Sequence, residues 1–94
     1  MTLNIKFIGA LRHISGQTQI TVPCPKEISL KELVENLSQN MPSLKKTLID
    51  QELSDARSNA LVLVNGKEIS VLEGLETKLC DGDEIVFVPV VHGG

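Results

Sequence analysis

Residues 28–42 carry the strongest local signal in the sequence, that of one amphipathic helix with both ends marked. Ser29 is a favourable N-cap residue, and Glu32 three positions later completes a capping box. Apolar side chains recur at the spacing of one helical face, at Leu30, Leu33, Val34, Leu37 and Met41. Pro42 then blocks continuation of the helix. A helix with a single apolar stripe has to lie on another layer, which the rest of the chain must supply.

The segments before this helix have the alternation of half-buried strands. Apolar and polar residues alternate over residues 3–7 and again over residues 18–22. Residues 10–17 break the alternation, and we expect them to form a loop with a turn at Gly16. Two strands this close in sequence are expected to pair as an antiparallel hairpin.

The segments after the helix supply further strands. A weaker helical pattern over residues 44–53 precedes an apolar strand that runs into Asn65-Gly66. Asn-Gly is the strongest short hairpin signal, because both central residues of a type I′ turn need positive φ. Residues 72–79 have no clear pattern, and an Asp-Gly turn then opens a final strand.

This order of elements predicts an α+β fold, with a mixed sheet of four to five strands and one main helix packed on one face. The chain has 94 residues, which suits one domain, expected over residues 1–90 with a flexible tail over residues 91–94. Hydrophobic residues make up 41% of the chain but only two are aromatic, so the core should be largely aliphatic.

Charge and hydropathy exclude several classes of partner. The formal net charge is −3, and no basic run exceeds the pair Lys45-Lys46, so nucleic acid is not an expected partner. No apolar run approaches the length of a membrane span, and the first residues lack a signal-peptide pattern. We therefore expect a cytoplasmic protein with no membrane partner.

The chain shows no convincing set of metal ligands or catalytic residues. Cys24 and Cys80 lie far apart and are interpreted as reduced structural thiols, with a redox or acceptor role as the alternative. His13 is expected to be a solvated loop residue. The acidic residues of "CDGDE", Asp81, Asp83 and Glu84, are interpreted as turn formers rather than metal ligands. We expect no metal, no stably bound cofactor and no catalysis by the chain itself.

The last residues, Gly93 and Gly94, have a chemical use that stability does not explain. Glycine is costly to order and contributes no side-chain contact, but it gives the thinnest possible chain. A carboxylate is a poor electrophile, so it has to be activated, most simply by ATP to an acyl-adenylate inside the site of another protein. A slim tail could thread its terminal carboxyl group into that site. His92 either shapes the fit of this tail or is a passive spacer.

The final strand also predicts a docking surface beside the tail. If Ile85 and Phe87 point toward the helix, Val86 and Val88 project to the other face of the sheet. A neighbouring strand could add Leu61 and Leu63, giving an aliphatic patch for a partner. The alternative is that a second layer or a dimer covers this patch, since apolar strands are sometimes buried on both faces.

The element order resembles the β-grasp, or ubiquitin-like, fold, and three stretches resemble one family within it. These are "FIGALRHISGQTQITV", "VLVNGKEI" and "LCDGDEIVFVPVVHGG". They are similar to the opening, the central hairpin and the ending of molybdopterin synthase small subunits, within the MoaD-ThiS-like sulfur carriers. The Gly-Gly ending is shared with thiamine-type sulfur carriers and with ubiquitin-related modifiers.

This resemblance implies a sulfur carrier. Gly94 would be adenylated by a ubiquitin-activating-type adenylyltransferase and converted to a thiocarboxylate. The sulfur would then pass to molybdopterin in molybdenum cofactor biosynthesis, with the tail inserted into the large subunit of the synthase. Thiamine, cysteine or tRNA thiolation are other destinations for the sulfur.

Two other functions remain open. The first is a protein modifier, in which Gly94 is joined to lysines of target proteins. The second is a small binding module whose tail is incidental.

Overall fold

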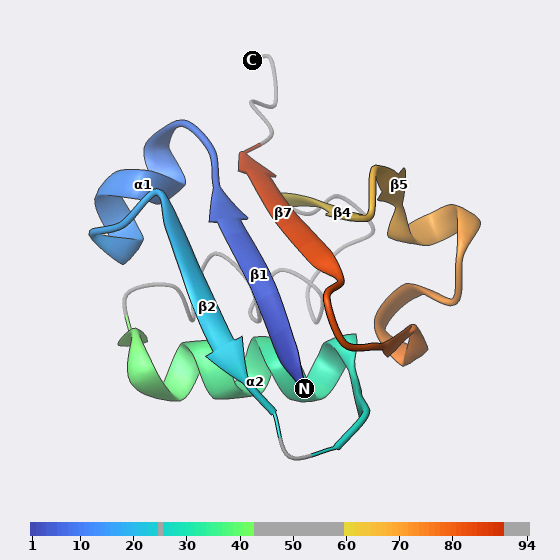
Figure 1. Cartoon of the computed structure of the whole chain (residues 1–94). Coiled ribbons are helices and arrows are strands. Elements are labelled where there is room, and N and C mark those ends of the chain that lie inside the picture. Colours follow the sequence, from blue (N-terminus) through green and yellow to red (C-terminus); the bar gives the residue numbers. More distant parts are fainter. Residues whose placement is uncertain (25, 43–59, 90–94) are drawn as a thin grey trace.

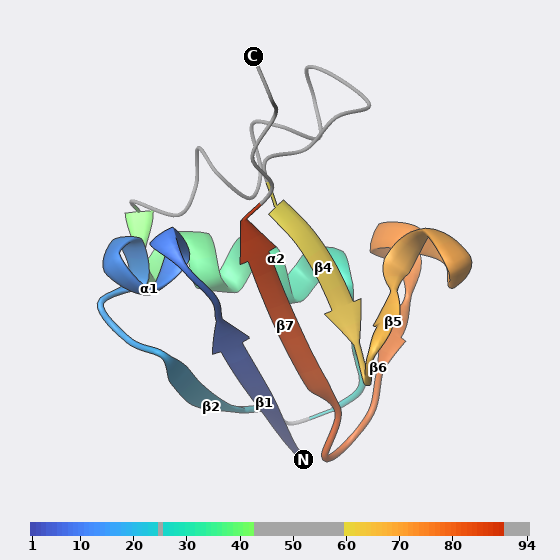
Figure 2. The ribbon, with the colours of Figure 1, turned by 90° about the horizontal axis from the view of Figure 1, so that it is seen from above.

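The computed structural model describes residues 1–24, 26–42 and 60–89. A five-stranded mixed sheet has the strand order β2-β1-β7-β4-β5, and its strands are β1 (Thr2–Phe7), β2 (Gln19–Pro23), β4 (Ala60–Val64), β5 (Lys67–Glu68) and β7 (Glu84–Pro89). A small second ladder pairs β3 (Ile28–Ser29) with β6 (Lys78–Leu79). The helix α2 (Leu30–Asn40) crosses one side of the sheet (Figures 1 and 2). This is the α+β β-grasp fold that the sequence predicts.

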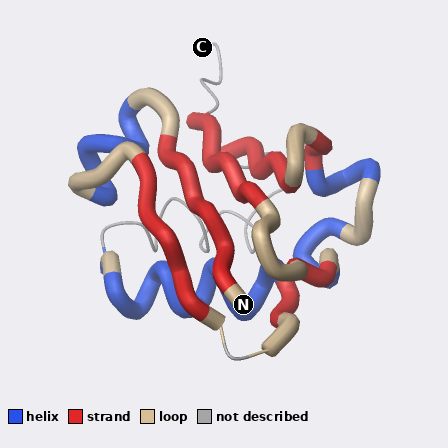
Figure 3. Tube along the Cα trace, viewed as in Figure 1, coloured by secondary structure: helices blue, strands red, loops and turns tan. Residues whose placement is uncertain are grey.

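The central strands fix where the chain leaves the sheet. β1 pairs with β2 as the expected antiparallel hairpin, and it pairs in parallel with β7. β4 lies on the other side of β7 and runs antiparallel to it. The last described residue of β7, Pro89, therefore lies at the same end of the sheet as Phe7 and Ala60. The described part of β7 ends here, beside the end of β1 and the start of β4 (Figure 3).

The core lies between α2 and the sheet. The apolar stripe of α2 is buried at Leu30, Leu33, Val34 and Leu37, and Met41 is partly buried beside it. From the sheet it meets Leu3, Ile5, Phe7, Val62, Val64, Ile85 and Phe87. The rings of Phe7 and Phe87 stack at 5.8 Å between centroids at the centre of this aliphatic core. Burial of about 0.8 kcal/mol per methylene makes this layer the main source of stability.

The ends of α2 are formed as the sequence predicts. The Glu32 amide donates to Ser29 Oγ at 3.2 Å, and the Ser29 amide donates to Glu32 Oε1 at 3.1 Å. The backbone hydrogen bond from Ser29, with a second from its hydroxyl group, holds the pKa of Glu32 below its ordinary value. The helix ends at Asn40, before Pro42. The predicted helical pattern over residues 44–53 lies outside the described residues.

The turns also follow the sequence. Asn65 and Gly66 have φ values of 51° and 85°, as a type I′ hairpin requires. The acidic turn is held by its own carboxylates: Asp81 accepts from the Thr2 amide at 2.7 Å, and Asp83 accepts from the Cys80 amide at 2.7 Å. Asp83 also accepts from the Asn65 side chain at 2.9 Å, which ties the two turns together. The interpretation as turn formers is confirmed for Asp81 and Asp83, whereas Glu84 begins β7 and its carboxylate pairs with Lys6.

Two predictions about the connections were wrong. Residues 10–15, expected to be part of a loop, form the short helix α1 (Ala10–Ser15), because Leu11 is buried against the sheet and Gly16 ends the helix in the left-handed conformation. Six residues are too few for helical periodicity to show. The stretch over residues 72–79 is not wholly irregular, since it contains the 3₁₀ turn η3 (Gly74–Glu76) and β6. A further 3₁₀ turn, η2 (Ile69–Val71), follows β5.

Candidate functional site

The final strand presents two different faces. Ile85 and Phe87 are fully buried toward α2, while Val86 and Val88 lie on the opposite side and remain partly exposed. α2 covers the first side of the sheet, and in the described part of the chain no helix crosses the second (Figures 1 and 2). The two valines thus have the orientation that alternation predicts.

The strand register brings the predicted apolar residues together on this open side. Leu61 pairs with Val88 and Leu63 with Val86, so four aliphatic side chains form two adjacent rows. Leu61 is 37% exposed, and Leu63 is partly buried. All four lie toward the end of β7 from which the tail begins. Their role in docking stays a prediction.

Ile8 extends these rows, and the sequence pattern did not single it out. It follows directly after β1, its amide donates to the Phe87 carbonyl oxygen at 3.0 Å, and its side chain is 44% exposed. Ile8 follows the inward-facing Phe7, so alternation alone could have placed it on the open side. We call Ile8, Leu61, Leu63, Val86 and Val88 the apolar patch.

Charged groups border the apolar patch at one side. Lys6 pairs with Val86 in the β1–β7 register, and its ammonium group lies 3.0 Å from the Glu84 carboxylate. Both side chains are 42% exposed, so this ion pair contributes little stability. It does mark the point where the open face changes from aliphatic to polar.

The root of the tail, by which we mean Pro89 at the end of β7, lies against the turn between β1 and α1. Gly9 has φ 59° and ψ −134°, a conformation that side chains disfavour. A Cβ atom at Gly9 would lie only 3.0 Å from Pro89 Cγ. Glycine is therefore required here both by the backbone and by the close approach of Pro89. The predicted working end itself, His92, Gly93 and Gly94, lies outside the described residues.

The two thiols have different environments. Cys24 is buried in the core, as a structural thiol should be, whereas Cys80 is exposed. The Cys80 thiol donates to Glu27 Oε2 at 3.5 Å, and this hydrogen bond to a carboxylate raises the pKa of Cys80. A raised pKa reduces the thiolate fraction, so the environment disfavours nucleophilic use of Cys80.

Other features narrow the kinds of site that the described residues can form. Within residues 1–24, 26–42 and 60–89, no three His, Cys, Asp or Glu side chains are grouped to hold a metal ion. His13 is exposed on α1, rather than in the predicted loop. Among the described helices, none has both the length and the apolar character to cross a membrane.

The sequence, through its last residue, is matched by a known family. The ThiS family model matches residues 5–94, which is nearly the whole sequence. The chain belongs to the ThiS family. The family predicted from the three sequence stretches is thereby confirmed.

The relatives of this ThiS family member carry names of two kinds. Small archaeal modifier protein 3 of Haloferax volcanii is 29% identical over 94 residues and covers 100% of both chains. Ubiquitin-related modifier 1 of Gallus gallus is 30% identical over 89 residues, or 94% of this chain and 82% of the relative. A protein of Archaeoglobus fulgidus, provisionally named a sulfur carrier, is 39% identical over 71 residues, which are 73% of this chain and 77% of the relative.

Solved structures agree with this placement. Small archaeal modifier protein 1 of Methanosarcina acetivorans has a TM-score of 0.79 and 30% identity, covering 99% of this chain and 96% of that one. A Pyrococcus furiosus protein provisionally named molybdopterin converting factor, subunit 1, has a TM-score of 0.78 and 18% identity, covering 97% of this chain and 99% of that one. The second likeness shows the fold alone. Together the comparisons place this ThiS family protein among small ubiquitin-like sulfur carriers and modifiers.

Proposed function

We propose that this protein is a sulfur carrier whose working group is the carboxyl group of Gly94. In the first step, the carboxylate attacks the α-phosphate of ATP, giving an acyl-adenylate and pyrophosphate. In the second, hydrosulfide attacks the acyl carbon and AMP leaves, and loss of the remaining S–H proton gives a thiocarboxylate. Membership of the ThiS family, matched through residue 94, is the observation that supports this most directly. The thiocarboxylate sulfur is a far better nucleophile than a carboxylate oxygen.

The partner would supply both the ATP site and the catalytic residues. A ubiquitin-activating-type adenylyltransferase fits this requirement, with ATP consumed by that enzyme rather than held by the carrier. Residues 90–94 span about 17 Å when extended, so the carboxyl group can enter a site that the folded body cannot. Ordering each tail residue costs about 1–2 kcal/mol, so the tail by itself supplies little affinity.

The apolar patch is the surface proposed to supply that affinity. Its aliphatic side chains lie on the open side of the sheet at the root of the tail. Burying each of them fully would contribute about 1.5–3 kcal/mol relative to full exposure, and somewhat less from their partly buried state. Docking here would direct the tail toward the partner, because β7 runs through the patch before the tail starts.

The proposed destination of the sulfur is molybdopterin. The closing stretch "CDGDEIVFVPVVHGG" supports this choice through its similarity to molybdopterin synthase small subunits. In that case the large subunit of the synthase is a second partner, which receives the tail after activation. The thiocarboxylate would then supply sulfur to the dithiolene.

Conjugation to lysines is the alternative that a specific observation favours. Two relatives covering most or all of the chain are named as modifiers. The same acyl-adenylate can be captured by a lysine amine, giving an isopeptide bond with loss of AMP. Both functions therefore share the first step and differ in the nucleophile that follows.

Intact-mass measurement after activation separates these possibilities. The purified protein is incubated with the adenylyltransferase of its own genome, ATP and a sulfur donor. The sulfur-carrier proposal predicts an oxygen-to-sulfur mass shift that a Gly94→Ala variant largely loses. A wild-type protein that never shows the shift, but is recovered on cellular lysines through Gly94, would support the modifier function instead. Full biological activity without Gly93 and Gly94 would contradict both.

A further inference from the structure

Acidic and basic residues are unevenly placed along the chain. All twelve Asp and Glu residues occur at position 27 or later, whereas the first 26 residues carry Lys6, Arg12 and Lys26 and no acid. The part that forms β1, α1 and β2 is therefore basic, although the protein as a whole has a net charge of −3. Lys6 is paired with Glu84 of β7, which leaves Arg12 as the basic residue of these three elements that has no ion-pair partner among the described residues.

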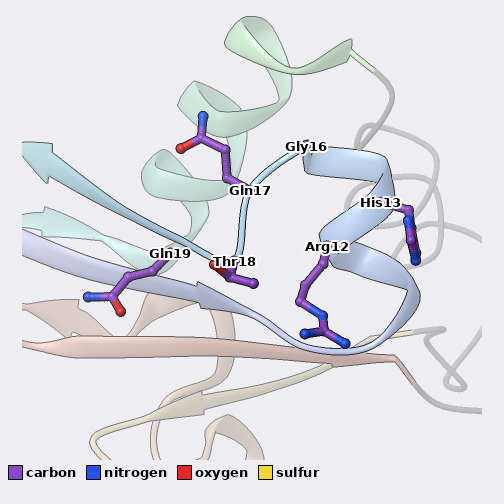
Figure 4. A pocket seen from close by; sticks show the side chains of 6 residues that line it. All are labelled: Arg12, His13, Gly16, Gln17, Thr18 and Gln19. Atoms are coloured by element: carbon purple, nitrogen blue, oxygen red, sulfur yellow. The ribbon is translucent and has the colours of Figure 1, made fainter.

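Arg12 stands between two neighbouring hollows in this basic part. The hollows measure about 630 and 320 Å³, and Arg12, Thr18 and Gln19 line both. Even the smaller one has roughly ten times the volume that a water molecule occupies in the liquid, so it can admit a side chain. Figure 4 shows the Arg12 side chain extending from α1 toward the strands, while His13 lies on the other side of the helix. We call this pair of cavities the Arg12 hollow.

The guanidinium group of Arg12 meets no anion within the part of the chain that the structure describes. In residues 1–24, 26–42 and 60–89, the single ion pair joins Lys6 to Glu84, and no hydrogen bond engages the Arg12 side chain. Of the described residues that line the two hollows, none is acidic. A planar guanidinium group suits a carboxylate, which it can bind through two parallel hydrogen bonds.

The Arg12 hollow is continuous with the apolar patch. Ile8 belongs to the patch, and it also lines the smaller hollow together with Lys6. A protein surface that packs on Ile8 would therefore also cover Arg12. An aliphatic contact bordered by a charged pocket is the arrangement of an interface in which the charge selects the partner and the apolar centre binds it.

We infer that the Arg12 hollow receives an Asp or Glu side chain of the adenylyltransferase that docks on the apolar patch. This inference rests on the proposed function. A nucleotide phosphate is the less suitable occupant, because ATP would react with Gly94, which is five residues beyond Pro89 and could reach about 17 Å from it if fully extended. The Arg12 hollow lies on the folded body beside the patch, where the partner's protein surface comes into contact.

The test measures activation kinetics of the full chain with the adenylyltransferase of its own genome, by release of pyrophosphate. Replacing Arg12 with Gln should raise the KM for the carrier about tenfold to a hundredfold, the effect of losing a charged hydrogen bond. The kcat and the KM for ATP should stay within about twofold, since the tail is unchanged. Added salt should reduce the difference in KM between wild type and variant, because it screens the ion pair.

Two matched variants separate the geometry of the pocket from charge alone. Lys31→Gln removes one positive charge from the exposed side of α2 and should leave the KM unchanged. Arg12→Lys keeps the charge but not the planar fork, and should give an intermediate KM. Equal losses in Arg12→Gln and Lys31→Gln would overturn the inference. Thermal unfolding of each variant checks that the fold is retained.

The remaining outcomes distinguish this inference from the function on which it rests. Normal activation of Arg12→Gln by an enzyme that adenylates the wild type overturns the inference and leaves the proposed function standing. A raised KM for ATP with an unchanged KM for the carrier assigns the hollow to the nucleotide and overturns it as well. A wild-type protein that the enzyme never adenylates would contradict both this inference and the proposed function. Rescue of Arg12→Glu by Arg at one acidic surface position of the enzyme would identify the paired carboxylate.

Discussion

Replacing Gly9 with Ala tests whether the root of the tail is held by contact with the turn before α1. The backbone of Gly9, with φ 59° and ψ −134°, is outside the conformations that alanine adopts readily. Holding a non-glycine residue in such a sparsely populated region costs about 1–3 kcal/mol. The new methyl group would also lie 3.0 Å from Pro89 Cγ, where carbon atoms normally keep about 3.5–4.0 Å.

These two terms set the expected loss of stability. Overpacking of a fitted contact costs about 1–3 kcal/mol, so the sum with the backbone term is centred near 3–4 kcal/mol. For a domain of this size, each kcal/mol lowers Tm by about 4–8 °C. Gly16→Ala is the matched control, because Gly16 also has positive φ but a Cβ there would meet no atom within 4 Å. It should cost only about 1–2 kcal/mol.

A double-mutant cycle in urea isolates the contact with Pro89. Pro89→Ala removes the Cγ atom that the new methyl group would meet, so Gly9→Ala should cost less in that background, by about 1–2 kcal/mol. When two residues do not interact, the changes in free energy of unfolding caused by their substitutions add to within about 0.3–0.5 kcal/mol. Additivity of the two substitutions within that margin would refute the claim that Gly9 and Pro89 are in close contact.

Three further predictions concern the patch, the helix cap and the exposed thiol. Val88→Asp should raise the KM for activation at least tenfold and change the free energy of unfolding in urea by less than about 1 kcal/mol. Thr21→Asp, on the same side of the sheet in β2, should leave both the KM and the free energy of unfolding nearly unchanged. Equal effects of the two would contradict the patch assignment. Because hydrogen bonds lower the pKa of Glu32, the carboxylate stabilises the fold above its ordinary value of 4.5, and this contribution is lost as the pH falls through the lowered pKa. Urea midpoints between about pH 7 and pH 3 should therefore fall less in Glu32→Gln than in wild type, and equal falls would show that the cap carboxylate does not matter. Glu27→Gln should lower the pKa of Cys80 and speed its alkylation near neutral pH, whereas an unchanged rate would mean that the hydrogen bond is absent in solution.

The elements that are encoded locally were predictable from the sequence. The stripe and cap of α2, the positive φ at Asn65 and Gly66, and the alternation of β1 and β7 all depend on residues within a few positions of each other. Family membership was also predictable, because the closing stretch is a contiguous motif. The orientation of Val86 and Val88 followed from alternation once the buried side was known.

The features that the sequence did not reveal depend on contacts between distant residues. Helix α1 is short, and it is held by the burial of Leu11 rather than by a periodic pattern. Ile8 joins Leu61 and Val88 only because β7 lies between β1 and β4. The close approach of Gly9 to Pro89 joins residues eighty positions apart, which no local pattern records.

The sequence by itself determined which segments form helix and strand, which turns reverse the chain, and which family the ending belongs to. Tertiary structure decided which side chains share the open side of the sheet and which charges lie beside them. The physical reason is one of range: propensity, capping and turn geometry act over a few residues, whereas strand register and packing act between segments that only the folded core brings together. The apolar patch exists because β1, β7 and β4 are neighbours in space, and the Arg12 hollow exists because α1 folds back beside β1 and the start of β2.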